Sequence, residues 1–92
     1  MNITYDELKM NNYKLIDVRE SKFYNMGHLN GSINIPVNNI LYNINILDKN
    51  NSYVFICESG KTSLKLSKLL NNLGYKTYSL DGGYINLINK NF

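Results

Sequence analysis

The chain has 92 residues, of which 43% are hydrophobic and 12% aromatic, and its formal net charge is +3. This length predicts one small domain over residues 1–92, and the scattered basic residues argue against a nucleic-acid partner. No run approaches the roughly 20 apolar residues of a membrane-spanning helix, and a single cysteine excludes both an internal disulfide and a zinc site made of several cysteines.

The first residues, MNITYDELK, carry acidic side chains and lack the basic and apolar regions of a secretion signal. We therefore expect no membrane partner and a cytoplasmic location. Within this segment Thr4 and Glu7 have the spacing of a capping box, which predicts that a short helix begins here.

The rest of the first half predicts short strands that alternate with helices. A buried strand is expected over residues 13–18, a helix over 20–26 that ends at Gly27, a strand over 32–35 that ends at Pro36, and an amphipathic helix over 37–47.

In the second half, residues 53–56 (YVFI) predict a central strand, because they are apolar on both faces. A helix over 63–73 follows, ended by Gly74, then a strand over 76–80, a turn over 81–83 and a short helix over 84–88. The leucine stripe of the first of these helices is predicted to be core: Leu66, Leu69, Leu70 and Leu73. This alternation predicts an α/β fold with a small, mostly parallel sheet of about five strands and helices on both faces.

Cys57 is the first residue after YVFI, at the strand end where ligands bind in parallel sheets. From there the chain turns tightly through Gly60, where a conformation open to glycine is expected, into a helix whose N-cap is expected to be Thr62 or Ser63. Amide groups of the turn and the positive end of the helix dipole form an anion pocket, which favours the nucleophilic thiolate.

Three single residues also allow other interpretations than a reactive site. A lone cysteine is most often a small buried apolar side chain, but the order strand, Cys57, tight turn, helix favours a reactive thiol. His28 is the only histidine, and we expect it to be architectural, since a thiolate formed by the loop needs no base. Tyr84 is compatible with the mouth of the pocket and with packing of the last helix.

Two segments resemble a known family. Residues 15–36, LIDVRESKFYNMGHLNGSINIP, resemble the first half of rhodanese-like domains, and residues 53–84 are similar to the second half in order and spacing. The resemblance implies the rhodanese-like fold and a sulfurtransferase without metal or organic cofactor. In it, Cys57 takes a sulfane sulfur from a small anion such as thiosulfate, carries it as a persulfide and passes it to a thiol, which a partner protein can bear, or to cyanide.

The resemblance also implies roles for the residues around Cys57. Those matching the substrate-binding loop are Glu58, Ser59, Gly60, Lys61, Thr62 and Ser63, and those matching the structural support are Asp17 and Arg19. Many active members have an arginine where Thr62 stands and a basic residue where Glu58 stands. The carboxylate of Glu58 disfavours thiosulfate by about 1 kcal/mol if it is exposed and screened, so a protein persulfide or a small persulfide is an alternative donor.

Two other functions are compatible with a cysteine in an anion loop. The first is a non-catalytic module of the same fold that binds a partner or senses redox state. The second is a phosphatase or arsenate reductase, which needs a loop closed by an arginine. The sixth residue after Cys57 is Ser63, and no arginine follows Arg19, so the sequence argues against this second function.

Overall fold

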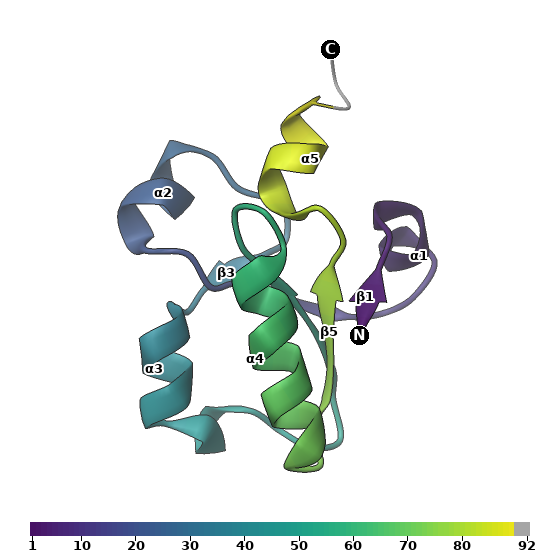
Figure 1. Cartoon of the computed structure of the whole chain (residues 1–92), viewed down its shortest axis with the longest axis vertical. Helices are drawn as coiled ribbons and strands as arrows, with labels where there is room; N and C mark the ends of the chain where they lie inside the picture. The colour runs from purple at the N-terminus through teal and green to yellow at the C-terminus, as the bar shows by residue number, and fades with distance from the viewer. Residues whose placement is uncertain (90–92) are drawn as a thin grey trace.

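The computed structural model describes residues 1–89, which form a five-stranded sheet with helices packed around it (Figure 1). The strands are β1 (Asn2–Ile3), β2 (Lys14–Asp17), β3 (Ile33–Asn34), β4 (Ser52–Ile56) and β5 (Lys76–Leu80). The helices are α1 (Tyr5–Lys9), α2 (Ser21–Met26), α3 (Val37–Tyr42), α4 (Lys61–Asn72) and α5 (Gly83–Asn89), with a 3-10 turn η1 (Ile44–Ile46). None of the helices in this described part is long and apolar enough to cross a membrane.

The strands lie in the order β1-β5-β4-β2-β3, and every neighbouring pair is parallel. The strand β4 is therefore central, as its apolar sequence predicted. Parallel neighbours require crossover connections, and the intervening helices supply them on both faces of the sheet. The predicted α/β class, with a parallel sheet covered on two sides, is confirmed.

Side chains of β4 alternate between two hydrophobic clusters, one on each face of the sheet. Phe55 packs with Ile40 of α3 and Leu70 of α4, and Figure 1 shows these two helices on the same side of the sheet. Val54 and Ile56 belong to the other cluster, whose further buried members are Ile3, Leu8 and Leu80. The core thus consists of two layers that meet at the central strand.

The edge strand β1 was not predicted from the sequence. It is only two residues long, too short for any periodicity, and tertiary pairing with β5 defines it. Its ends are fixed by hydrogen bonds from Ser79 N to Met1 O (2.7 Å) and from Asp81 N to Ile3 O (2.8 Å).

The helix predicted over residues 37–47 is wrong in its second half. The helix α3 ends at Tyr42, Asn43 adopts a non-helical φ of −144° and ψ of 66°, and the 3-10 turn η1 follows. Ile44 and Leu47 still pack against the same core cluster as Ile40. The apolar residues therefore pack on one common face although the helix does not continue through them. The break falls at Asn43, because asparagine is a poor residue for helix interiors.

The helix α4 begins two residues before its predicted start. Its N-cap is Gly60 in the left-handed region (φ 93°, ψ −10°), so Thr62 and Ser63 do not cap it. Gly74 ends the helix as predicted, with φ 93°, and Tyr75 N donates to Leu70 O at 3.0 Å, as in a Schellman motif.

Half of the leucine stripe of α4 lies outside the core. Leu66 and Leu70 are buried, whereas Leu69 and Leu73 are 46% and 47% exposed. Leu69 lines a shallow gap towards α3, and Leu73 is the C-cap at the open end of the helix. Helical spacing therefore identified the buried face of α4 correctly. The predicted core was too wide, because only Leu66 and Leu70 of the four leucines lie in it.

The start of α5 lies directly against the loop that follows β4. Tyr84 N donates to Cys57 O at 2.8 Å, and Ile85 N donates to Glu58 O at 3.0 Å. Figure 1 shows the loop before α4 next to α5. Gly83 permits this approach, because a Cβ there would lie 2.5 Å from Glu58 O and its φ is +66°.

Replacement of Gly83 by alanine should destabilise the domain and displace this loop. Steric clash and left-handed strain together predict a loss of about 3 kcal/mol in the free energy of unfolding, measured by urea denaturation. Gly31→Ala is the matched control, because Gly31 has a φ of +86° but a Cβ added there would meet no atom within 4 Å. It should lose only about 1 to 2 kcal/mol, and equal losses in the two variants would contradict the packing argument.

Candidate functional site

Cys57 lies at the carboxyl end of β4, where the start of α4 and the loop before it meet the sheet. Its side chain is only 6% exposed and contacts the core cluster, yet it lines a cavity of about 520 Å³. The other lining residues are Val18, Arg19, Glu20, Phe23, Glu58 and Thr62. The thiol is therefore packed on one side and faces open space on the other.

Three groups of the protein surround the sulfur of Cys57. The backbone amides of Gly60 and Ser63 donate to Sγ at 3.1 and 3.3 Å, and the Ser63 hydroxyl lies 3.2 Å away. Two N–H groups and one hydroxyl aimed at a single atom complement negative charge on the sulfur. The left-handed backbone of Gly60 is what turns its own amide inward.

A second serine, Ser79, contacts the hydroxyl of Ser63. Ser79 Oγ on β5 lies 2.6 Å from Ser63 Oγ, and both hydroxyls lie within hydrogen-bond distance of Gly60 O, at 3.2 Å from Ser63 and 3.3 Å from Ser79. Both side chains are fully buried. Sequence reasoning missed Ser79, and the available signal was a small polar residue inside an otherwise buried strand.

The remaining residues of the loop separate into two groups. Glu58 and Thr62 line the cavity in front of Cys57, and the Glu58 side chain is 49% exposed at its mouth. Ser59 and Lys61 are exposed and do not line it. The cationic side chain of Lys61, which matches the family's substrate-binding loop, is thus not among the residues that line this cavity.

Asp17 and Arg19 form a buried ion pair beside the loop. Arg19 Nη2 and Nε donate to Asp17 Oδ2 at 2.8 and 3.1 Å, and Arg19 N and Nε each donate to Asp17 Oδ1 at 3.0 Å. Burial alone would lower the pKa of Arg19, but hydrogen bonds and charge from Asp17, followed by those of Glu58, raise it above its usual value. The guanidinium therefore stays charged inside the protein.

The same guanidinium connects Asp17 to three other parts of the fold. Its Nη2 donates to Gly27 O after α2 at 2.7 Å, its Nη1 lies 3.4 Å from Glu58 Oε2, and it stacks on the Tyr84 ring at 4.3 Å. Asn34, which the sequence analysis did not single out, donates from Nδ2 to the carbonyl oxygens of Asp17 and Arg19. Arg19 thus fixes the loop and α5 relative to the sheet.

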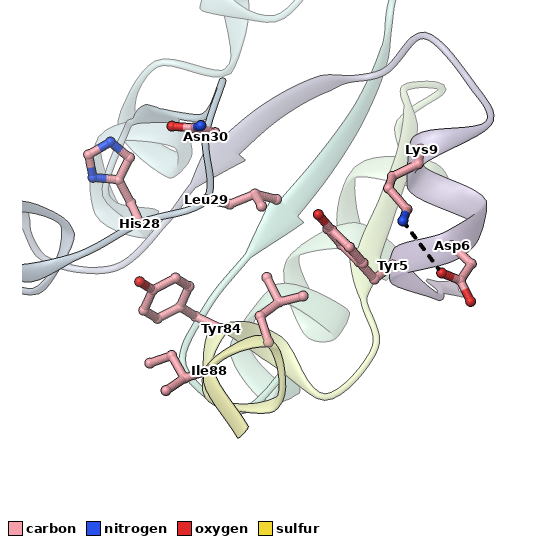
Figure 2. A pocket seen from close by; sticks show the side chains of 9 residues that line it. Tyr5, Asp6, Lys9, His28, Leu29, Asn30, Tyr84 and Ile88 are labelled. Carbon is pink, nitrogen blue, oxygen red and sulfur yellow. Dashed lines mark ion pairs between the residues drawn. The ribbon is translucent and has the colours of Figure 1, made fainter. Parts of the chain in front are cut away.

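A separate cavity of about 570 Å³ lies between α1, α5 and the segment 28–30 (Figure 2). Figure 2 shows Tyr84 and Ile88 of α5 opposite Tyr5 and Lys9 of α1, and the other lining residues are Asp6, His28, Leu29, Asn30 and Leu87. Cys57 does not line this cavity. His28 has its ring stacked on Tyr24 and Nδ1 2.9 Å from Tyr24 O, so these contacts are local.

The residues that the structure describes include no group of three or more His, Cys, Asp and Glu side chains suited to a metal ion. The chemical resources near Cys57 are therefore the sulfur itself, the amides and hydroxyls around it, and the charged pair of Arg19 and Glu58.

Known proteins share both this fold and this sequence pattern. A family profile described as "Rhodanese-like domain" matches residues 2–90. The chain belongs to the rhodanese-like domain family. Among solved structures, a rhodanese-related protein of Thermoplasma volcanium has a TM-score of 0.86 to this rhodanese-like domain, with 28% identity, covering 99% of this chain and 93% of that one.

Relatives of this rhodanese-like domain carry sulfurtransferase names. YtwF of Bacillus subtilis, which bears a provisional sulfurtransferase name, is 39% identical over 69 residues, 75% of this chain and 67% of its own. The thiosulfate sulfurtransferase GlpE of Shewanella oneidensis is 31% identical over 72 residues, 77% of this chain and 71% of its own. The resemblance inferred from residues 15–36 and 53–84 is thereby confirmed.

Removal of the charge on Arg19 should destabilise this rhodanese-like domain strongly. Arg19→Met keeps a long side chain but leaves the fully buried Asp17 without its partner, which predicts a loss of about 3 to 5 kcal/mol in the free energy of unfolding. Lys22→Met is the control, because the Lys22–Glu20 pair is exposed and its loss should change stability by less than about 1 kcal/mol. Similar urea midpoints for Arg19→Met and the unsubstituted chain would refute this assignment.

Proposed function

We propose that this rhodanese-like domain is a sulfurtransferase in which Cys57 takes up a sulfane sulfur and carries it as a persulfide. The observation that carries the proposal is the sulfur of Cys57, which receives two amide hydrogen bonds and faces a cavity of about 520 Å³. The names of the relatives support sulfur transfer as the general role.

In the first step, the Cys57 thiolate attacks the outer sulfur of a donor such as thiosulfate or a persulfide. A bond forms between Sγ and that sulfur, while the donor's own sulfur–sulfur bond breaks and its electron pair leaves with sulfite or with a thiolate. The amides of Gly60 and Ser63 lie within hydrogen-bond reach of Sγ, so they stabilise negative charge as it passes through the site.

In the second step, the thiolate of an acceptor attacks the outer sulfur of the Cys57 persulfide. The acceptor becomes a persulfide, and Cys57 returns as a thiolate; cyanide in an assay takes the same sulfur to give thiocyanate. Both steps exchange one sulfur between nucleophiles, so neither needs a metal or an organic cofactor. The open mouth of the cavity suits an acceptor thiol carried on a partner protein, since it is bordered by the exposed side chains of Glu58 and Phe23.

The loop residues then have distinct parts in the proposal. Gly60 and Ser63 bind the sulfur, Thr62 and Glu58 face the incoming substrate, and Asp17 with Arg19 holds the loop in place. Lys61 and Ser59 lie outside the cavity lining, so we assign them no direct contact with substrate.

Incubation with thiosulfate, or with a small persulfide, should add the mass of one sulfur atom to the chain at Cys57. The intact mass is read by mass spectrometry, and cyanide should remove the added sulfur as thiocyanate. Cys57→Ser keeps the size of the side chain but lacks the nucleophile, so it should gain no sulfur from any donor. Absence of sulfur uptake by the unsubstituted chain from every donor would leave the non-catalytic binding or redox-sensing module as the better explanation.

Loss of the Ser63 hydroxyl should slow sulfur uptake without removing it. Ser63→Ala deletes the group 3.2 Å from Sγ but keeps both amides, and a hydrogen bond to a charged atom is worth about 1.5 to 3 kcal/mol, so a decrease of about tenfold or more in rate constant is expected.

Ser67→Ala is the matched control for that experiment. Ser67 is also buried on α4, but its hydroxyl donates to Thr77 O at 3.0 Å and not to the sulfur. This variant should lose stability while its rate constant for sulfur uptake stays unchanged. Equal slowing in both variants would mean that Ser63 acts only through the stability of α4.

A further inference from the structure

We infer that this domain takes its sulfur from the persulfide of a cysteine side chain in preference to thiosulfate, and that Glu58 makes the selection. The inference deepens the proposed sulfur transfer and rests on it. It depends on the charges that line the cavity, on the position of Glu58 and on the size and apolar character of the space.

The residues that line the cavity of Cys57 carry more negative than positive charge. Its charged lining residues are one guanidinium, Arg19, and two carboxylates, Glu20 and Glu58. The Arg19 guanidinium is occupied by Asp17, Gly27 O and Glu58. Within the described part of the chain, the lining therefore offers no cation that is not already engaged by the protein.

Glu58 is held in place beside this cavity. Its backbone oxygen accepts from Ile85 N at 3.0 Å, and its side chain lies 3.4 Å from Arg19 Nη1, so the residue is held from two sides. It lines both the cavity of Cys57 and an adjoining one of about 220 Å³. An anion that enters the cavity of Cys57 lies near this carboxylate, and a doubly charged one is repelled more than a singly charged one.

Lysines near the site do not offset that repulsion directly. Lys22 pairs with Glu20 at 3.8 Å, and neither Lys22 nor Lys61 lines the cavity. Thiosulfate carries two negative charges, whereas a persulfide carries at most one on its terminal sulfur. The difference in charge alone therefore favours the persulfide at this mouth.

The space in front of Cys57 is large and partly apolar. The two adjoining cavities share Arg19, Phe23 and Glu58, and their rim exposes the apolar side chains of Phe23, Met26 and Ile88. A small oxyanion would leave most of this volume unfilled and would leave the apolar side chains of the rim exposed to water. A cysteine persulfide with its attached carbon groups fills more of the space and covers apolar surface.

The transfer balances without any further reactant. The Cys57 thiolate attacks the terminal sulfur of the cysteine persulfide, and a new bond forms from Sγ to that sulfur. The sulfur–sulfur bond of the donor breaks, and its electron pair remains on the donor cysteine, which leaves as a thiolate. The terminal proton, where present, travels with the transferred sulfur.

The test compares rate constants for sulfur uptake at Cys57 from thiosulfate and from the persulfide of N-acetylcysteine amide, which carries no charge beyond that of its terminal sulfur. Glu58→Gln should raise the thiosulfate constant relative to the persulfide constant by about 5- to 10-fold, because the doubly charged donor loses more repulsion. Thr62→Lys adds a cation to the lining without touching Glu58 and should act in the same direction. Asp6→Asn, an exposed carboxylate on α1, changes the net charge equally and should change neither constant.

Salt and donor size supply two further readouts. Added salt should raise the thiosulfate constant of the unsubstituted chain more than that of Glu58→Gln, because screening weakens the same repulsion that the substitution removes. A third donor, an uncharged peptide that carries a cysteine persulfide between apolar residues, represents a protein donor. Comparison with the N-acetylcysteine amide persulfide distinguishes a protein donor from a small-molecule donor. If Phe23→Ala lowers the rate constant for sulfur uptake from the peptide only, the donor is a protein. If it changes the rate constants for both persulfides equally, the donor is a small molecule.

Two results would overturn the inference in different ways. If Glu58→Gln and Thr62→Lys leave the ratio of the two rate constants unchanged, Glu58 does not select the donor, while the proposed sulfur transfer stands. If the unsubstituted chain gains no sulfur from either donor, both the selection and the proposed function are rejected.

Discussion

The buried ion pair of Asp17 and Arg19 is the contact on which the arrangement around Cys57 depends. Asp17 ends the strand β2 beside the central strand and is fully buried, so its carboxylate requires a partner of opposite charge. Arg19 meets that requirement and uses its remaining donors on Gly27 O and Glu58. A buried ion pair of this kind adds little net stability over an apolar pair, but it fixes the relative positions of the loop, α2 and the sheet.

This structural use of Arg19 has a chemical consequence. A guanidinium next to a cysteine is ordinarily suited to bind an oxyanion in two-point fashion, but here it is already engaged by Asp17, Gly27 O and Glu58. Stabilisation of negative charge therefore falls to the amides that contact the sulfur. The sulfur of Cys57 contacts backbone amides, whereas the incoming substrate lies near the carboxylate of Glu58.

Sequence reasoning identified the features that depend on neighbours in the chain. The strand before Cys57, the left-handed Gly60, the capping box of Thr4 and Glu7, and the glycine at the end of α4 were all predicted correctly. Each is decided by residues within a few positions of one another, because turns, caps and helical periodicity are local. The alternation of these elements was sufficient to predict a parallel sheet covered on both faces and, with the resemblance, the family.

Tertiary structure alone decided which residues distant in the chain meet. Ser79 on β5 reaches Ser63, and Glu58 after β4 reaches Arg19 after β2, because parallel strands bring their carboxyl ends to one edge of the sheet. The position of Lys61 outside the cavity lining likewise follows from where α4 packs. The sequence by itself determined a cysteine in an amide-lined turn of a rhodanese-like chain. Which charges face that cysteine depends on packing between strands, since no local pattern records which distant side chains share one cavity.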